Sequence, residues 1–480
     1  MANDLKKKTV SGFAYKMMER IGAQGVNFIV SIVLARILMP EEYGIISLVL
    51  VLITLLDVFV TYGFGNSLIA NKNSDNVDFS TCFYFGIFLS IIVYTVVFLG
   101  APVVANFYNI ELLTPVLRVM GLRIPIAAVN SVQQAYVSKH MMFKKFFIST
   151  SIGTVLSGII AIIMAYQGFG VWALVEQYLG NVVCDTVCLW IIVGWRPIRA
   201  FSFERLKKIY DYGWKILVVG LIDTGYNQLR SLVIAKKYTS SDLAYYNKGN
   251  QFPSLGMSVI EPTVNGVLFP ALSQCSDNQE EMRGITQRMI MMSTYIVFPM
   301  LIGLMVVAKQ LVIVLLTEKW LPCVIFLQIG CLAFMFRPLQ FINNSVIKAA
   351  GESGLLLKLD VLKKTIGILL LLVSINYGVE GIAISLVITN VISTIINIAP
   401  NRRILNYGYA AQLIDIGKSG VLAVIMGIIV YSIGFLPINA FPLLVIQIII
   451  GVGFYVGASY FAKNESFIYS LQIIKEFKQR

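Results

Sequence analysis

The chain has 480 residues, of which 57% are hydrophobic and 13% are charged, and its formal net charge is +13. A soluble globular domain carries about 25% charged residues, so this composition excludes an ordinary water-soluble protein. Apolar runs such as GIISLVLVLITLLDVFV (44–60) approach the roughly 20 residues with which a helix spans a bilayer. We therefore predict an all-α polytopic membrane protein.

Apolar segments predict fourteen transmembrane helices, in chain order 12–35, 44–66, 80–101, 112–136, 147–167, 170–194, 213–235, 244–270, 288–308, 321–347, 360–377, 380–400, 418–436 and 441–461. An even number of spans places both termini on one side. By our count, loops on that side hold 24 of the 38 Lys and Arg residues, and the opposite loops hold five. Because cytoplasmic loops are enriched in Lys and Arg, both termini are expected in the cytoplasm. The same rule explains the net positive charge without a nucleic-acid partner.

Two sequence phrases recur six spans apart. SIVLARILMPEEYG (31–44) returns as SLVIAKKYTSSDLA (231–244), and RIPIAAVNSVQQA (123–135) returns as RPLQFINNSVIKA (337–349). Because six is an even number, the copies share one orientation, as in transporters with parallel repeats. We predict two six-helix lobes, 1–211 and 212–404, followed by two C-terminal helices and a cytoplasmic tail in 405–480.

Polar side chains follow single helical faces in spans that are equivalent in the repeat. An ionisable group inside a span is costly and usually faces a protein or water-filled interior. The residues are Arg20, Gln24 and Asn27 in the first span, Asp223, Asn227 and Arg230 in the seventh, Arg123 and Asn130 in the fourth, and Arg337 and Asn344 in the tenth. The pattern predicts a polar cavity between two lobes.

The predicted cavity is cationic, with candidate ligands Arg20, Arg118, Arg123, Arg230, Lys248 and Arg337. Since guanidinium groups bind phosphate oxygens in a planar fork, a phosphate-bearing lipid or a charged glycan is the expected substrate. Candidates for binding a coupling H+ or Na+ are Asp57, Asp223 and Glu261. The alternative for each single charge is a structural ion pair, or a lysine that reaches the membrane interface.

No metal or other cofactor is expected. The six cysteines lie mostly within or beside apolar runs, where free thiols behave as small apolar residues. Cys184 and Cys188 share a helical spacing, but no His or further Cys stands near them in the sequence.

Four motifs carry a resemblance that covers essentially the whole chain: LARILMPEEYG (34–44), YVSKHMMFKKFF (136–147), FPALSQCSDNQEEMR (269–283) and IKAAGES (347–353). Together with the six-plus-six-plus-two layout, the chain resembles the polysaccharide-transporter branch of the MOP superfamily, and within it the Wzx (WzxC/TuaB-like) oligosaccharide flippases.

The resemblance implies a V-shaped, MATE-like pair of lobes in the bacterial cytoplasmic (inner) membrane. It also implies alternating-access translocation of an undecaprenyl-diphosphate-linked oligosaccharide, without enzymatic activity and by a monomer. Expected partners are membrane lipids and the polysaccharide polymerase or export machinery. Members of the related lipid II flippase branch use arginines of the first span and of the second lobe, which points to Arg20 and Arg230 here.

Three alternatives stay open. A cation-coupled multidrug or metabolite antiporter of the same fold is predicted to have a more acidic or aromatic cavity. A membrane glycosyltransferase or polymerase needs an extended outer loop, and the predicted outer loops are all short. A passive scaffold within the glycan assembly machinery leaves the matched Arg123 and Arg337 without a role.

Overall fold

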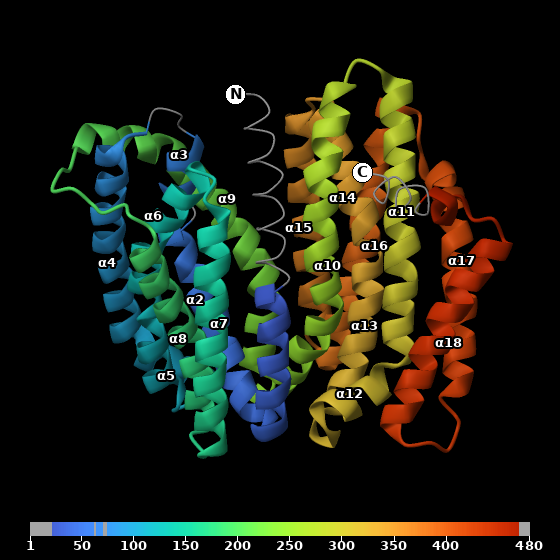
Figure 1. The fold of residues 1–480 in the computed structure, drawn as a ribbon, viewed down its shortest axis with the longest axis horizontal. Coiled ribbons are helices and arrows are strands. Elements are labelled where there is room, and N and C mark those ends of the chain that lie inside the picture. Colours follow the sequence, from blue (N-terminus) through green and yellow to red (C-terminus); the bar gives the residue numbers. More distant parts are fainter. Residues whose placement is uncertain (1–21, 62–63, 71–73, 470–480) are drawn as a thin grey trace. The chain divides into compact units, whose positions relative to one another are not determined.

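The chain is described by a computed structural model, which covers residues 22–61, 64–70 and 74–469. Within these ranges it consists of α-helices and one 3-10 turn and contains no strand, which confirms the predicted all-α class (Figure 1). After a first helix that includes Gly22–Ile37, the elements are α2 (Pro40–Thr61), α3 (Phe64–Ala70), α4 (Asn76–Tyr108), α5 (Leu113–Gly121), α6 (Arg123–Lys139), α7 (Phe143–Tyr166), α8 (Val171–Ile192), α9 (Phe203–Lys237), α10 (Ser240–Gln274), α11 (Gln279–Val306), α12 (Ala308–Leu316), η1 (Glu318–Trp320), α13 (Cys323–Met335), α14 (Arg337–Ala349), α15 (Ser353–Ser374), α16 (Gly378–Leu405), α17 (Tyr409–Ile433) and α18 (Ala440–Phe461).

Ten helices in the described part of the chain are long and apolar enough to cross a membrane, counting α5 with α6 and α13 with α14 as one each. This confirms a multi-pass membrane protein. Helices α8, α9 and α15 also coincide with predicted spans but are more polar; α15, for example, carries Lys358, Asp360, Lys363 and Lys364. The number fourteen therefore stays a prediction.

The chain separates into two compact units, one up to Ala244 and one from Tyr245 onward. The sequence-based boundaries after residues 211 and 404 do not coincide with this division. Helix α9 packs on α2, α3 and α4, which holds it in the first unit, and α17 packs on α11, which holds the C-terminal pair in the second. The repeat boundaries themselves stay a prediction.

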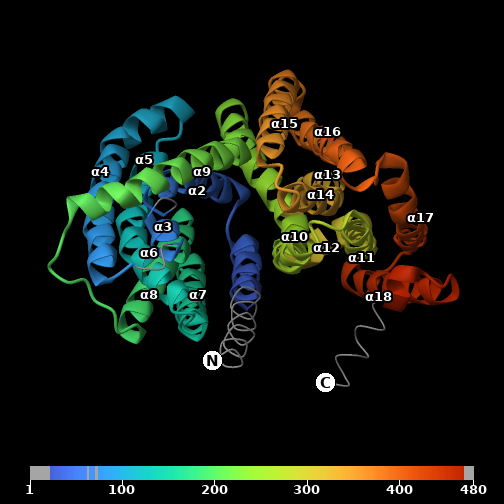
Figure 2. The same cartoon turned by 90° about the horizontal axis from the view of Figure 1, so that it is seen from above.

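In the first unit, α7 and α8 form a closely packed pair beside α6 (Figure 2). Gly153 of α7 makes this approach possible, because a Cβ atom there would lie 3.0 Å from the backbone nitrogen of Asp185 and 3.1 Å from the carbonyl oxygen of Asn181. Two polar residues of α8 are thereby held against α7.

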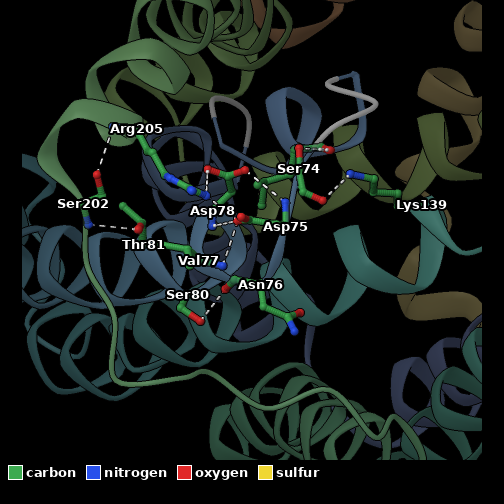
Figure 3. A network of polar contacts seen from close by, with 11 residues as sticks. Ser74, Asp75, Asn76, Val77, Asp78, Ser80, Thr81, Lys139, Ser202 and Arg205 are labelled. Atoms are coloured by element: carbon green, nitrogen blue, oxygen red, sulfur yellow. Dashed lines mark hydrogen bonds and ion pairs between the residues drawn. The ribbon is translucent and has the colours of Figure 1, made fainter.

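A polar network ties the connection between α8 and α9 to the start of α4 (Figure 3). Asp75 caps α4 by accepting hydrogen bonds from the backbone nitrogens of Val77 and Asp78, both at 3.0 Å. Arg205 of α9 reaches Asp75 at 2.5 Å and Asp78 at 3.2 Å. The hydrogen bond from Arg205 is the main reason that the pKa of Asp75 is lowered to about 2. The backbone nitrogen of Ser202 also donates to Thr81 Oγ1, at 3.2 Å.

The predicted fourth and tenth spans are both broken into two half-helices. Helix α5 ends before Leu122 and α6 begins at Arg123, while α13 ends before Phe336 and α14 begins at Arg337. A proline follows closely in each case, at Pro125 and Pro338. Proline lacks the backbone N–H and its ring clashes with the carbonyl four residues earlier, so it kinks or breaks a helix. Both breaks place an arginine as the first residue of a half-helix.

Candidate functional site

In the first unit, the arginine at the break is paired with an acid of α2. Arg123 Nε lies 3.3 Å from Asp57 Oδ2, and the two side chains are 28% and 15% exposed. Asp57 Oδ1 and Arg123 Nε are buried and make no hydrogen bond to the described residues. The pair is therefore held by charge attraction, with hydrogen-bonding capacity left over.

In the second unit, the equivalent arginine has the same kind of partner. Arg337 Nη2 lies 3.6 Å from Glu261 Oε2 of α10, and the side chains are 42% and 31% exposed. The guanidinium carbon also lies 5.2 Å from the centre of the Phe334 ring. The sequence suggested separate roles for these arginines and acids, and the structure brings them together as two matched pairs.

The Arg337 pair, the more exposed of the two, is open to competition by an anion. The first N–H groups of a helix have no partner within the helix, and its N-terminus carries a partial positive charge. A partly exposed ion pair is weakly held in water, typically by 0–1 kcal/mol. A phosphate group can therefore compete with the carboxylate for the same guanidinium, and it accepts two parallel hydrogen bonds from it.

A polar cavity of about 670 Å³ adjoins the pair in the first unit. Three predicted site residues, Asp57, Arg123 and Asn130, share its lining. Asn130 Nδ2 donates to Asp185 Oδ2 at 2.8 Å, and Thr150 Oγ1 donates to Asp185 Oδ1 at 3.4 Å. The cavity thus lies among α2, α3, α6, α7 and α8.

Sequence analysis did not assign Asp185, Asn181 or Thr150 to the site. Asn181 and Asp185 stand four residues apart on α8, so a polar stripe was present in the sequence. The sequence could not show that Thr150, on α7, faces these residues of α8.

Other predicted cationic residues lie outside the lining of this cavity. Arg118 Nε donates to the carbonyl oxygen of Phe98 at 3.1 Å, and its guanidinium stacks on the same ring at 4.4 Å. Arg230 is buried, with its guanidinium 6.0 Å from the centre of the Tyr226 ring.

Lys248 is also buried, with Nζ 5.7 Å from the centre of the Trp320 ring. It precedes Glu261 on α10 by about 20 Å of helix, at the usual rise per residue. It therefore does not join the Arg337 pair.

The predicted polar and coupling residues are more dispersed. Arg20 lies outside the described residues. Gln24, Asp223 and Asn344 are half-buried, whereas Asn27 and Asn227 are exposed. None of these five described residues lines the first-unit cavity.

Among the residues that the structure describes, no three His, Cys, Asp or Glu side chains are grouped as a metal site requires. All six cysteines are free thiols, so Cys184 and Cys188 are not joined by a disulfide.

Comparison with known proteins agrees with the resemblance seen in the sequence. The chain is 24% identical over 321 residues to the succinoglycan biosynthesis transport protein ExoT of Rhizobium meliloti, a match that covers 67% of this chain and 65% of that protein. It is 23% identical over 439 residues to the lipopolysaccharide biosynthesis protein WzxC of Escherichia coli, covering 90% of this chain and 88% of that protein.

Two solved structures share the fold. The lipid II flippase MurJ in an inward closed conformation superposes with a TM-score of 0.74 at 14% identity, over 95% of this chain and 99% of that one. An inward-facing multidrug resistance MATE family transporter of the MOP superfamily gives a TM-score of 0.64 at 15% identity, over 83% and 98%.

The family assignment rests on the match to a family model. Residues 33–325, more than half of the chain, match the family described as polysaccharide biosynthesis protein. The predicted relationship to polysaccharide biosynthesis proteins is confirmed, and the fold is the one seen in transporters of the MOP superfamily. This chain belongs to the polysaccharide biosynthesis protein family.

Proposed function

We propose that the protein is a flippase, which moves an undecaprenyl-diphosphate-linked oligosaccharide across the bacterial cytoplasmic membrane for export of a surface polysaccharide. The observation that carries this proposal is the position of Arg337, with a partly exposed guanidinium at the start of a half-helix and a single carboxylate as its partner.

In the proposed mechanism, the diphosphate takes the Arg337 guanidinium from Glu261. The attraction between the guanidinium and its partner grows with the charge of the anion. A diphosphate, with more than one negative charge, therefore competes well against one carboxylate. When the carboxylate recaptures the arginine, the headgroup is released, so the same pair assists both loading and unloading.

The proposal also includes the arrangement of the spans, the coupling ion and the oligomeric state. The chain has fourteen spans in a six-plus-six-plus-two layout with both termini in the cytoplasm, and the headgroup is exposed to the two sides of the membrane in turn. Asp57, Asp223 or Glu261 binds the coupling H+ or Na+. The protein works as a monomer next to the polymerase or export machinery and performs no chemistry on the glycan.

A multidrug or metabolite antiporter is the main rival, because transporters of that kind share the fold. It would need neither of the matched arginines for an anionic headgroup. A membrane glycosyltransferase or polymerase is more remote, since the relatives that match over most of their length are named for biosynthesis and transport of polysaccharides.

The test is a gene deletion complemented with wild type, Arg337→Gln or Arg403→Gln. Arg403 is the matched control, because it pairs with Glu352 at 3.1 Å but is 84% exposed on the surface. We expect lipid-linked oligosaccharide to accumulate in the deletion strain, and only Arg337→Gln to fail in restoring surface glycan at equal expression. Unchanged surface glycan with increased drug sensitivity would instead support the antiporter.

A further inference from the structure

The first-unit cavity is larger than a phosphate site requires, and the charges of its lining differ from those of such a site. Its 670 Å³ fall within the 300–1,000 Å³ typical of small-molecule sites. At about 30 Å³ per water molecule, this is room for some twenty waters, far more than a single ion and its ligands occupy. The cavity is therefore sized for an organic group.

The charges of the lining argue against a phosphate as that group. Among the described residues that line it, Arg123 is the one cation, and it shares the lining with two acids, Asp57 and Asp185. Their combined charge is negative when both are ionised, so a diphosphate deep in the cavity would be repelled. Arg337 of the second unit, by contrast, forms its ion pair with one acid, Glu261.

The lining instead offers many hydrogen bonds to a neutral polar ligand. Asn130 is only 4% exposed, and its Oδ1 atom makes no hydrogen bond to the described residues, although its Nδ2 is bound to Asp185. Asp57 Oδ1 is likewise a buried acceptor with no donor among the described residues. Because both atoms are buried, hydrogen bonds to a ligand come from the more exposed groups of the lining.

Further polar groups and one aromatic ring complete the lining. Gln134 is exposed on the same face of α6 as Asn130, and Thr150 and Asn181 stand opposite on α7 and α8. Phe146 adds an aromatic ring, whose electron-rich face attracts the C–H groups of a ligand. Planar amides, carboxylates and hydroxyls beside one aromatic ring suit a ligand with many hydroxyl groups and apolar C–H faces.

We propose that this cavity binds a sugar ring of the glycan headgroup and so selects which oligosaccharide is transported. The inference rests on the proposed function and assigns its two tasks to different places: Arg337 holds the diphosphate, and the cavity of the first unit recognises the sugar. Each sugar hydroxyl both donates and accepts, so it accepts from the side-chain amide of Gln134 or Asn181 while donating to Gln134 Oε1 or Thr150 Oγ1.

The experiment compares two probes on the full-length protein in nanodiscs. One is the lipid-linked oligosaccharide extracted from the deletion strain, and the other is undecaprenyl diphosphate without glycan. We expect wild type to prefer the glycosylated lipid, and Gln134→Leu and Thr150→Val each to reduce this preference about five-fold, since one lost hydrogen bond is typically worth about that factor. Binding of the bare lipid should stay unchanged in both variants.

Thr95→Val is the matched control, because Thr95 is exposed on α4 and outside the cavity lining, and its hydroxyl donates to the Ile91 carbonyl oxygen at 2.8 Å. It should keep the wild-type preference. Glycan released from its lipid should compete with the glycosylated lipid, which shows that the sugar itself is bound rather than the lipid.

The outcomes separate the two proposals. An unchanged preference in both cavity variants would overturn the sugar site and leave the flippase proposal standing. Bare-lipid binding that does not respond to Arg337→Gln would contradict the diphosphate site of the proposed function instead. Thermal stabilisation by NaCl but not by free glycan, lost in Asp185→Asn, would reassign the cavity to a cation and overturn the sugar site.

Discussion

Glu261 lies 3.6 Å from Arg337, and it approaches from α10 the first residue of α14. If this carboxylate competes with the diphosphate for the guanidinium, removing its charge should favour the bound substrate. We predict that Glu261→Gln binds undecaprenyl diphosphate up to about five-fold more tightly, since a partly exposed ion pair is worth up to about 1 kcal/mol. Transport should nevertheless slow, because release loses its competitor.

Affinity in nanodiscs and flipping in proteoliposomes would check this prediction. Glu352→Gln, which removes the partner of the surface residue Arg403, should change neither quantity. Weaker binding in Glu261→Gln would mean that the acid helps to hold the substrate rather than to compete with it.

The two broken helices give a second prediction. Alanine at Pro338 restores a backbone N–H that can bond to the Phe334 carbonyl oxygen, so α13 and α14 should tend to become continuous. We expect Pro338→Ala to retain or increase the thermal midpoint while it reduces transport, because the start of the half-helix beside Arg337 is lost. A fall in midpoint with normal transport would show that the break serves stability only.

Helix packing in the second unit predicts a strong effect at Gly249. A Cβ atom there would lie 2.7 Å from the backbone nitrogen of Leu327 and 2.8 Å from the carbonyl oxygen of Cys323. Gly249→Ala must therefore push α10 away from α13 and should destabilise the protein by about 1–3 kcal/mol. Gly453→Ala is the control: no neighbour lies within 4 Å of its added Cβ, and alanine favours a helix. Thermal unfolding in detergent would separate the two.

The pKa of Asp75 predicts how stability depends on pH. Because Arg205 lowers this pKa from 3.8 to about 2, the ionised carboxylate stabilises the folded state fully above about pH 4. This contribution is lost as the pH falls from about 4 through 2. Arg205→Gln should therefore have a lower thermal midpoint than wild type at pH 6, and the difference should shrink towards pH 2.5.

The control for this pH series is Lys418→Gln, which removes an ion pair with Glu465 whose two side chains are 68% and 69% exposed. Its midpoint should stay close to that of wild type throughout. A gap between Arg205→Gln and wild type that is independent of pH would show that Arg205 stabilises the fold by packing rather than through Asp75.

Much of the fold could be predicted from the sequence, since hydrophobic runs locate membrane helices directly. The repeated R-x6-NSV phrase predicted matched positions for Arg123 and Arg337, and the structure places both at the start of a half-helix. The breaks themselves were not predicted, although Pro125 and Pro338 are helix-breaking residues in the sequence. The partners of the arginines were not predictable, because Asp57 and Glu261 are distant in sequence and meet them only through helix packing.

Contacts between basic residues and aromatic rings could not be predicted from the sequence either. Arg118 and Lys248 are basic residues within predicted spans, as a cationic cavity would require. Only the packing of their helices shows that they lie against Phe98 and Trp320. Likewise, the division between Ala244 and Tyr245 depends on where α9 packs and not on the length of the repeat.

The sequence repeat predicts that the two arginine pairs are copies of one motif, yet only the first is bordered by Asn130, Asp185 and Thr150. Under that prediction, duplication leaves one copy free to diversify. If the residues around Arg123 change between relatives while Arg337 and Glu261 are kept, the protein can transport a new glycan without any change in the site that binds the carrier lipid. Exchanging a handful of side chains on α6, α7 and α8 would then be enough to redirect such a transporter from one exported glycan to another.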